Sequence, residues 1–193
     1  KNVTLETREN SLVTKNIRKK IKQWKRVEVL KDYRFYIISL NMLAMPSIAT
    51  GVFVYQSFIL SSKNWGPFVI AQSFMVYSVM SVITLTVAGF LIDKFSSRRL
   101  LIFMNIPLFL SAVILAKFNS ELSSFVFFAF VGITNGLANV LGSSTWAEIY
   151  GVKFIGSVKA LSTSLMVFAT ASGTAIFGIL IDYGLSINQI AVY

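Results

Sequence analysis

Five long apolar runs, separated by short polar segments, dominate the chain after residue 34. The runs cover residues 35–60, 67–92, 100–118, 125–146 and 157–181, and a further run begins near Ile187. A helix that crosses the hydrocarbon core of a bilayer needs about 20 mostly apolar residues. None of the runs alternates with the period of a β-strand. The pattern therefore predicts an all-α polytopic membrane protein with about five transmembrane helices in residues 35–193, preceded by a polar segment, 1–34.

The basic residues predict which loops stay inside the cell. The segment before the first run holds eleven Lys and Arg, and the following segments hold one, three, one and two. Because loops rich in Lys and Arg remain cytoplasmic, residues 1–34, 89–99 and 147–156 are predicted to be cytoplasmic. The two intervening loops are predicted to face outside. We expect an integral multi-pass protein of the plasma (inner) membrane.

The N-terminal segment has its own amphipathic pattern. Ile17, Ile21 and Trp24 recur at helical spacing among many basic residues. This pattern predicts a basic amphipathic helix that lies on an anionic inner leaflet. A calmodulin-type or nucleic-acid partner is the alternative. Because positive charge beside a first span already has a topological explanation, the bilayer is the expected partner and nucleic acid is not.

Composition narrows the chemistry further. Only 13% of the 193 residues are charged and 55% are hydrophobic, whereas about 25% of a soluble domain is charged. The net charge is +10, and the sequence contains neither Cys nor His. Thiol chemistry, zinc sites built on these ligands and imidazole catalysis are therefore excluded for this chain. We expect no enzymatic activity, no catalytic residue, no metal and no cofactor.

A charged turn, GFLIDKFSSRR, ends the second apolar run. Its charged residues are Asp93, Lys94, Arg98 and Arg99. The fifth run is expected to start near Asp93, and an acid that faces a helix N-terminus gains about 0.3–1 kcal/mol. The arginines can pair with Asp93 or with Glu148. Contacts of this kind can form in one conformation and break in another, so the turn is predicted to be a conformational gate. The alternative is that the bases only fix topology and Asp93 is a solvated counter-charge.

Gly89 lies one helical turn before Asp93. A glycine at this position permits the close approach of another helix. The small residues along residues 157–181 offer a matching surface. Gly89 is therefore included with the gate residues.

Polar residues inside the runs mark candidate contacts with a solute. Asn135, Asn139, Ser143 and Trp146 fall on one face of the fourth run. An amide surrounded by lipid must find a partner, so this face either lines a cavity or joins two helices. Tyr77 and Gln56 are further polar positions inside runs. The substrate-binding candidates are Asn135, Asn139, Tyr77 and Gln56.

The charged turn resembles a known motif. Major facilitator superfamily transporters carry the pattern Gly-x-Leu-x-Asp-Arg/Lys-x-Gly-Arg-Arg/Lys between the second and third helices of each half. Gly89, Leu91, Asp93, Lys94 and Arg98 match this pattern, whereas Ser96 and Ser97 replace its Gly and Arg. Residues 147–156 resemble the family's short Glu-x-x-Gly loop. Residues 171–182 resemble its eleventh helix, with Thr174 in place of the usual Pro. Residues 29–40 and the layout of the first two spans look most like the oxalate–formate and monocarboxylate branch.

The resemblance implies a fold and a function. The five spans would be helices seven to eleven of a twelve-helix major facilitator fold, and the chain would be a fragment that lacks its N-terminal half. The implied function is secondary active transport of a small solute by alternating access, with an organic anion as one class of solute. No ionisable residue lies near the middle of a run, so the missing half would have to supply a charge for an anion. A non-transporting receptor or scaffold on the same fold is the alternative.

Overall fold

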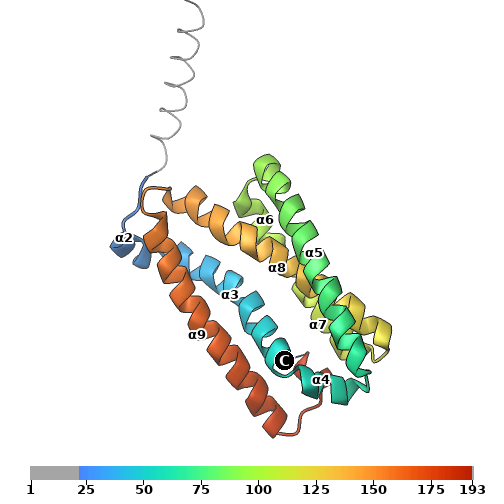
Figure 1. The fold of residues 1–193 in the computed structure, drawn as a ribbon. Coiled ribbons are helices and arrows are strands. Elements are labelled where there is room, and N and C mark those ends of the chain that lie inside the picture. The colour runs from blue at the N-terminus through green and yellow to red at the C-terminus, as the bar shows by residue number, and fades with distance from the viewer. Residues whose placement is uncertain (1–21, 193) are drawn as a thin grey trace, which may run out of the picture.

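The computed structural model describes residues 22–192, which form helices joined by short turns and contain no strand (Figure 1). The helices are α2 (Arg26–Leu30), α3 (Tyr33–Val54), α4 (Gln56–Lys63), α5 (Pro67–Phe95), α6 (Ser97–Phe103), α7 (Ile106–Lys117), α8 (Glu121–Tyr150), α9 (Ile155–Asp182) and α10 (Ile187–Ile190). Five segments are long and apolar enough to cross a membrane, with α6 and α7 together forming one of them. The prediction of an all-α protein with five membrane-spanning segments is confirmed.

Two of the five apolar runs are interrupted. The first run divides at Tyr55, where the backbone (φ −98°, ψ 23°) leaves the helical region between α3 and α4. The third run divides between α6 and α7, and Pro107 lies in the first turn of α7. Proline lacks an amide hydrogen and is tolerated in a first turn because that hydrogen would have no partner inside the helix.

Glycine contacts bring α8 against α5. A β-carbon added at Gly132 would lie 2.5 Å from the carbonyl oxygen of Tyr77, and one added at Gly136 would lie 2.6 Å from that of Ser81. The absence of side chains at these two positions lets the backbones of the two helices touch. This is the most extensive helix–helix contact among the described residues.

A second close pair joins α3 and α9, which run side by side in Figure 1. A β-carbon at Gly173 would lie 2.6 Å from the carbonyl oxygen of Ser47, and Ser47 Oγ donates a hydrogen bond to the carbonyl oxygen of Ala169 (3.0 Å). Helix α9 is therefore the partner of α3. The close approach expected at Gly89 is not found, because no atom of another described segment lies within 4 Å of a β-carbon placed there.

An apolar cluster ties the segment before α3 to the α8–α9 turn. Its buried members are Val29, Phe35, Trp146, Tyr150 and Val158. Trp24 packs edge-on against Tyr150 (5.5 Å between ring centroids) and donates its backbone N–H to the Tyr150 carbonyl (3.1 Å). Trp24 precedes α2 and contacts protein, which corrects its predicted place on a membrane-bound helix. The other predicted members of that helix, Ile17 and Ile21, lie outside the described residues.

At the opposite end of the bundle a buried lysine joins three segments. Four oxygens surround Lys63 Nζ, namely the Leu115 carbonyl (2.5 Å), the Phe118 carbonyl (2.9 Å), Asn119 Oδ1 (2.7 Å) and Asn188 Oδ1 (2.5 Å). These oxygens come from the C-terminal end of α7, the turn that follows it and the start of α10. Burial lowers the pKa of the Lys63 ammonium below its ordinary value.

Gly132→Ala is expected to lower the stability of the intact protein. The added methyl group would meet the Tyr77 carbonyl at 2.5 Å, and overpacking of this kind costs about 1–3 kcal/mol. Gly89→Ala is the matched control, because its methyl group would enter open space and alanine is the better helix former. The midpoint of thermal unfolding in detergent measures the stability of both variants. An equal loss of stability in the two variants would contradict the assigned α5–α8 contact.

Candidate functional site

A cavity of about 470 Å³ lies between α3, α5, α8 and α9. Its wall combines apolar side chains with a polar stripe from α8. The residues that line it are Met42, Met45, Pro46, Ala49, Thr50 and Phe53 of α3, Tyr77 of α5, Asn135, Ala138, Asn139, Gly142, Ser143 and Trp146 of α8, and Lys159, Ser162, Thr163 and Met166 of α9. The polar face predicted for the fourth apolar run thus borders this cavity.

The two asparagines use their amide nitrogens on protein partners. Asn135 Nδ2 donates to Ser81 Oγ (2.8 Å), and Asn139 Nδ2 donates to the Asn135 carbonyl oxygen (2.9 Å). Within residues 22–192, neither amide oxygen accepts a hydrogen bond. The Nδ2 group of each asparagine therefore stabilises the fold, whereas its Oδ1 atom can accept a hydrogen bond from a solute.

The other two candidates differ in their location. The Tyr77 ring borders the cavity and packs edge-on against Phe53 (5.5 Å between centroids). Gln56 begins α4, beyond the break at Tyr55, and is not part of the cavity wall. The structure therefore brings Asn135, Asn139 and Tyr77 together and leaves Gln56 apart from them.

Lys159 adds a positive charge to the edge of the cavity. It lies in the second turn of α9, is exposed, and donates from Nζ to Ser143 Oγ (2.8 Å). Sequence reasoning assigned no base to this site, because Lys159 lies near the end of its run. The signal that could have found it is its position two residues after the predicted start of the fifth run, inside the run rather than in the loop before it.

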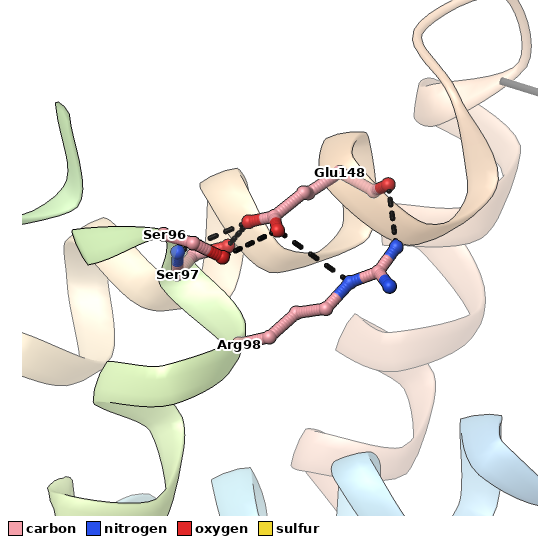
Figure 2. Close-up of polar contacts among 4 residues, drawn as sticks. All are labelled: Ser96, Ser97, Arg98 and Glu148. Carbon is pink, nitrogen blue, oxygen red and sulfur yellow. Dashed lines mark hydrogen bonds and ion pairs between the residues drawn. The ribbon is translucent and has the colours of Figure 1, made fainter. Parts of the chain in front are cut away.

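Figure 2 shows a second polar site, the Glu148 socket, which comprises Ser96, Ser97, Arg98 and Glu148. Ser96 Oγ donates to Glu148 Oε1 (2.5 Å), and the Ser97 backbone N–H donates to Oε2 (3.0 Å). Ser97 Oγ also donates to Oε2. Arg98 Nε lies 3.5 Å from Oε1, and Arg98 Nη2 donates to the Glu148 carbonyl oxygen (2.9 Å). The carboxylate therefore faces the N-terminus of α6, where negative charge is stabilised.

Ser96 and Ser97, which replace Gly and Arg of the resembled motif, both donate hydrogen bonds to the Glu148 carboxylate. Ser96 has φ 71° and ψ 139°, a backbone conformation that glycine adopts readily and that costs another residue about 1–3 kcal/mol. The resembled motif has Gly at this position. Hydrogen bonds to a charged acceptor contribute about 1.5–3 kcal/mol each, so the bond to Glu148 offsets the strain at Ser96. Sequence reasoning noted the replacements and missed this role.

The remaining predicted gate residues do not enter the socket. The Asp93 and Arg99 side chains are exposed, and neither side chain forms a hydrogen bond or ion pair with residues 22–192. Lys94 Nζ lies over the Phe95 ring, 5.5 Å from its centroid. The acid that lies at a helix N-terminus is thus Glu148, at the start of α6. The sequence had instead predicted that Asp93 would lie at the start of the fifth span.

No protein-family model matches the chain, and neither does any curated protein or solved structure. The cavity and the Glu148 socket therefore carry the functional argument. They lie on the same helix, since α8 supplies both the asparagines and Glu148.

Glu148→Gln is expected to open the first turn of α6. The amide side chain cannot accept from both serines and the Ser97 N–H as a carboxylate does, so the backbone amides near residue 97 should exchange with solvent about tenfold faster. Hydrogen exchange of the intact protein, followed by mass spectrometry, measures this change. Asp93→Asn also removes one negative charge near this turn, but from a side chain outside the socket, and should leave exchange within about twofold of the unmodified protein. An equal effect of both variants would show that net charge, rather than the socket, holds this turn.

Proposed function

We propose that the chain is part of a secondary active transporter that moves a small solute by alternating access through the cavity between α3, α5, α8 and α9. The observation that carries this proposal is a cavity between four helices long and apolar enough to span a membrane, with a polar stripe on its wall whose two asparagine amide oxygens accept no hydrogen bond within residues 22–192. Its volume of about 470 Å³ is within the roughly 300–1,000 Å³ usual for small-molecule sites. Polar groups inside a membrane bundle are costly unless they meet water or a ligand.

The wall suggests which solutes the site would accept. The oxygens of Asn135 and Asn139 can accept hydrogen bonds, the Tyr77 hydroxyl can donate one, and Lys159 supplies a cation at the cavity edge. We infer a small polar solute with hydrogen-bond donors, and an organic anion is one class that fits. In the proposed role Gln56 has no direct contact with the solute.

The Glu148 socket is the proposed latch. Its contacts join α8 to the turn between α5 and α6, so a movement of this turn away from α8 would have to break them. Breaking several charge-assisted hydrogen bonds together would give two discrete states, as alternating access requires. The charge-rich turn and its resemblance to the major facilitator motif support this role. We further propose that the chain forms the C-terminal half of such a fold, with the N-terminal half completing the pathway in the plasma (inner) membrane and residues 1–34 in the cytoplasm.

Asn139→Cys is expected to react with a membrane-impermeant maleimide from both sides of the membrane. The 193 residues contain no cysteine, and the Asn139 amide donates only to its own helix, so the substitution is mild. Alternating access exposes the cavity to each side in turn. Labelling of intact cells and of inside-out vesicles measures the two exposures. Phe109→Cys on α7, exposed and outside the cavity, is the control and should stay unlabelled.

Labelling of Asn139→Cys in only one of the two preparations would contradict alternating access. That result would favour the non-transporting receptor or scaffold. The experiment needs no knowledge of the solute, so it can precede a search for one.

Asn135→Ala is expected to reduce solute uptake, once a transported solute is found, by about tenfold or more, because a lost hydrogen bond to a polar ligand costs about 1–3 kcal/mol. The change also removes the bond to Ser81, and Ser81→Ala provides the matched control. This control breaks the same interhelical bond and leaves the Asn135 oxygen in the cavity. Initial uptake rates at equal membrane expression compare the two. Equal losses would assign Asn135 to helix packing instead of solute binding.

A further inference from the structure

A second hollow, of about 320 Å³, lies at the Glu148 end of the bundle and shares no lining residue with the solute cavity. It is lined by Arg34, Ile37, Ile38, Arg98, Leu101 and Ile149. Helices α3, α6 and α8 each contribute to it. Its wall differs from that of the solute cavity, since the polar groups are two guanidinium groups and the rest is branched aliphatic.

The charge of the hollow is positive and is only partly compensated. No acidic residue is part of its wall. Two carboxylates adjoin residues of this wall in the sequence, and both already have hydrogen-bond donors. Glu148 is held in its socket, and Asp32 accepts from the Arg34 backbone N–H (3.0 Å) and from the Tyr150 hydroxyl (3.1 Å). Arg98 uses only Nε and Nη2 on Glu148. A guanidinium has five N–H donors, so both arginines retain donors for an anion.

The aliphatic part of the hollow continues along α3. Ile37 is 62% exposed, and Leu40, about one turn further along the helix, is 74% exposed. An apolar surface that leads away from two arginines at a membrane edge matches the chemistry of a phospholipid, whose phosphate adjoins its acyl chains. A soluble phosphate ester would use the arginines and gain nothing from the aliphatic surface.

We propose that this hollow binds an anionic phospholipid, with the phosphate between Arg34 and Arg98 and an acyl chain along Ile37 and Leu40. In the orientation predicted from the basic loops, the hollow faces the cytoplasmic leaflet, where anionic lipids concentrate. The proposal depends on membrane insertion and not on transport. Because Arg98 also contacts Glu148, a bound phosphate would share that guanidinium with the socket and couple the lipid to the latch.

Native mass spectrometry of the intact protein, titrated with phosphatidylglycerol or phosphatidylcholine, tests the site. The protein should prefer phosphatidylglycerol, and Arg34→Gln should weaken its binding about tenfold, as expected for a lost charge-assisted contact. Arg34→Gln leaves the Glu148 socket in place, because the Arg34 side chain takes no part in it. Lys153→Gln removes one exposed positive charge from the same end of the bundle, outside the hollow, and should change binding less than twofold.

A second variant separates the hollow from the fold around Arg34. Ile37→Asp leaves both arginines in place and adds a negative charge at an exposed position inside the hollow, so it should weaken phosphatidylglycerol binding to a similar extent. Equal weakening by Arg34→Gln and Lys153→Gln, or normal binding by Ile37→Asp, would overturn the site in favour of non-specific attraction. Displacement of the lipid by an equal concentration of glycerol phosphate would also overturn it, because the ligand would then be a soluble phosphate ester.

Discussion

A helix end at a membrane edge leaves backbone groups that only a polar partner can satisfy, and this constraint determines how the α6–α7 span is held. Its N-terminal end presents the Ser97 N–H to the Glu148 carboxylate. Its C-terminal end presents the Leu115 and Phe118 carbonyls to the Lys63 ammonium. Each end thus meets a charge of the sign that the helix dipole favours. The two charges come from α8 and α4, so the same contacts that satisfy the span also fix it against the rest of the bundle.

Close backbone packing produces two tight pairs with a cavity between them. Glycines on α8 bring it against α5, and Gly173 brings α9 against α3. Packing between the pairs, where α8 meets α3 and α9, is far less extensive. The cavity occupies this looser interface and is lined by all four helices. An interface with few close contacts is where relative motion costs least, so the proposed site and the proposed movement have the same structural origin.

Sequence reasoning predicted the spans well, because length and hydropathy are local properties. It could not predict the partners of the helices. Gly89 and Gly132 are equivalent as residues in an apolar run, and only the folded structure reveals that α8 meets a backbone at Gly132 while Gly89 faces open space. The break at Tyr55 carries no proline or glycine signal. Periodicity indicates which residues share a face, as it did for Asn135 and Asn139, but not what that face contacts.

The charged turn illustrates the same limit and has a physical consequence. The charges of the turn predict that its basic residues pair with an acid, but they do not indicate whether that acid is Asp93 or Glu148. The answer depends on which carboxylate lies within reach of the α6 N-terminus. Glu148 does, and it collects two hydroxyl donors, one amide and one guanidinium. Of these donors only Arg98 also lines the second hollow. The guanidinium is the exposed member of the socket, with Nε 3.5 Å from the carboxylate and Nη2 bonded to the Glu148 carbonyl oxygen. In the proposed roles, a lipid in the second hollow would therefore act on the proposed latch through Arg98 while the serines keep Glu148 in place.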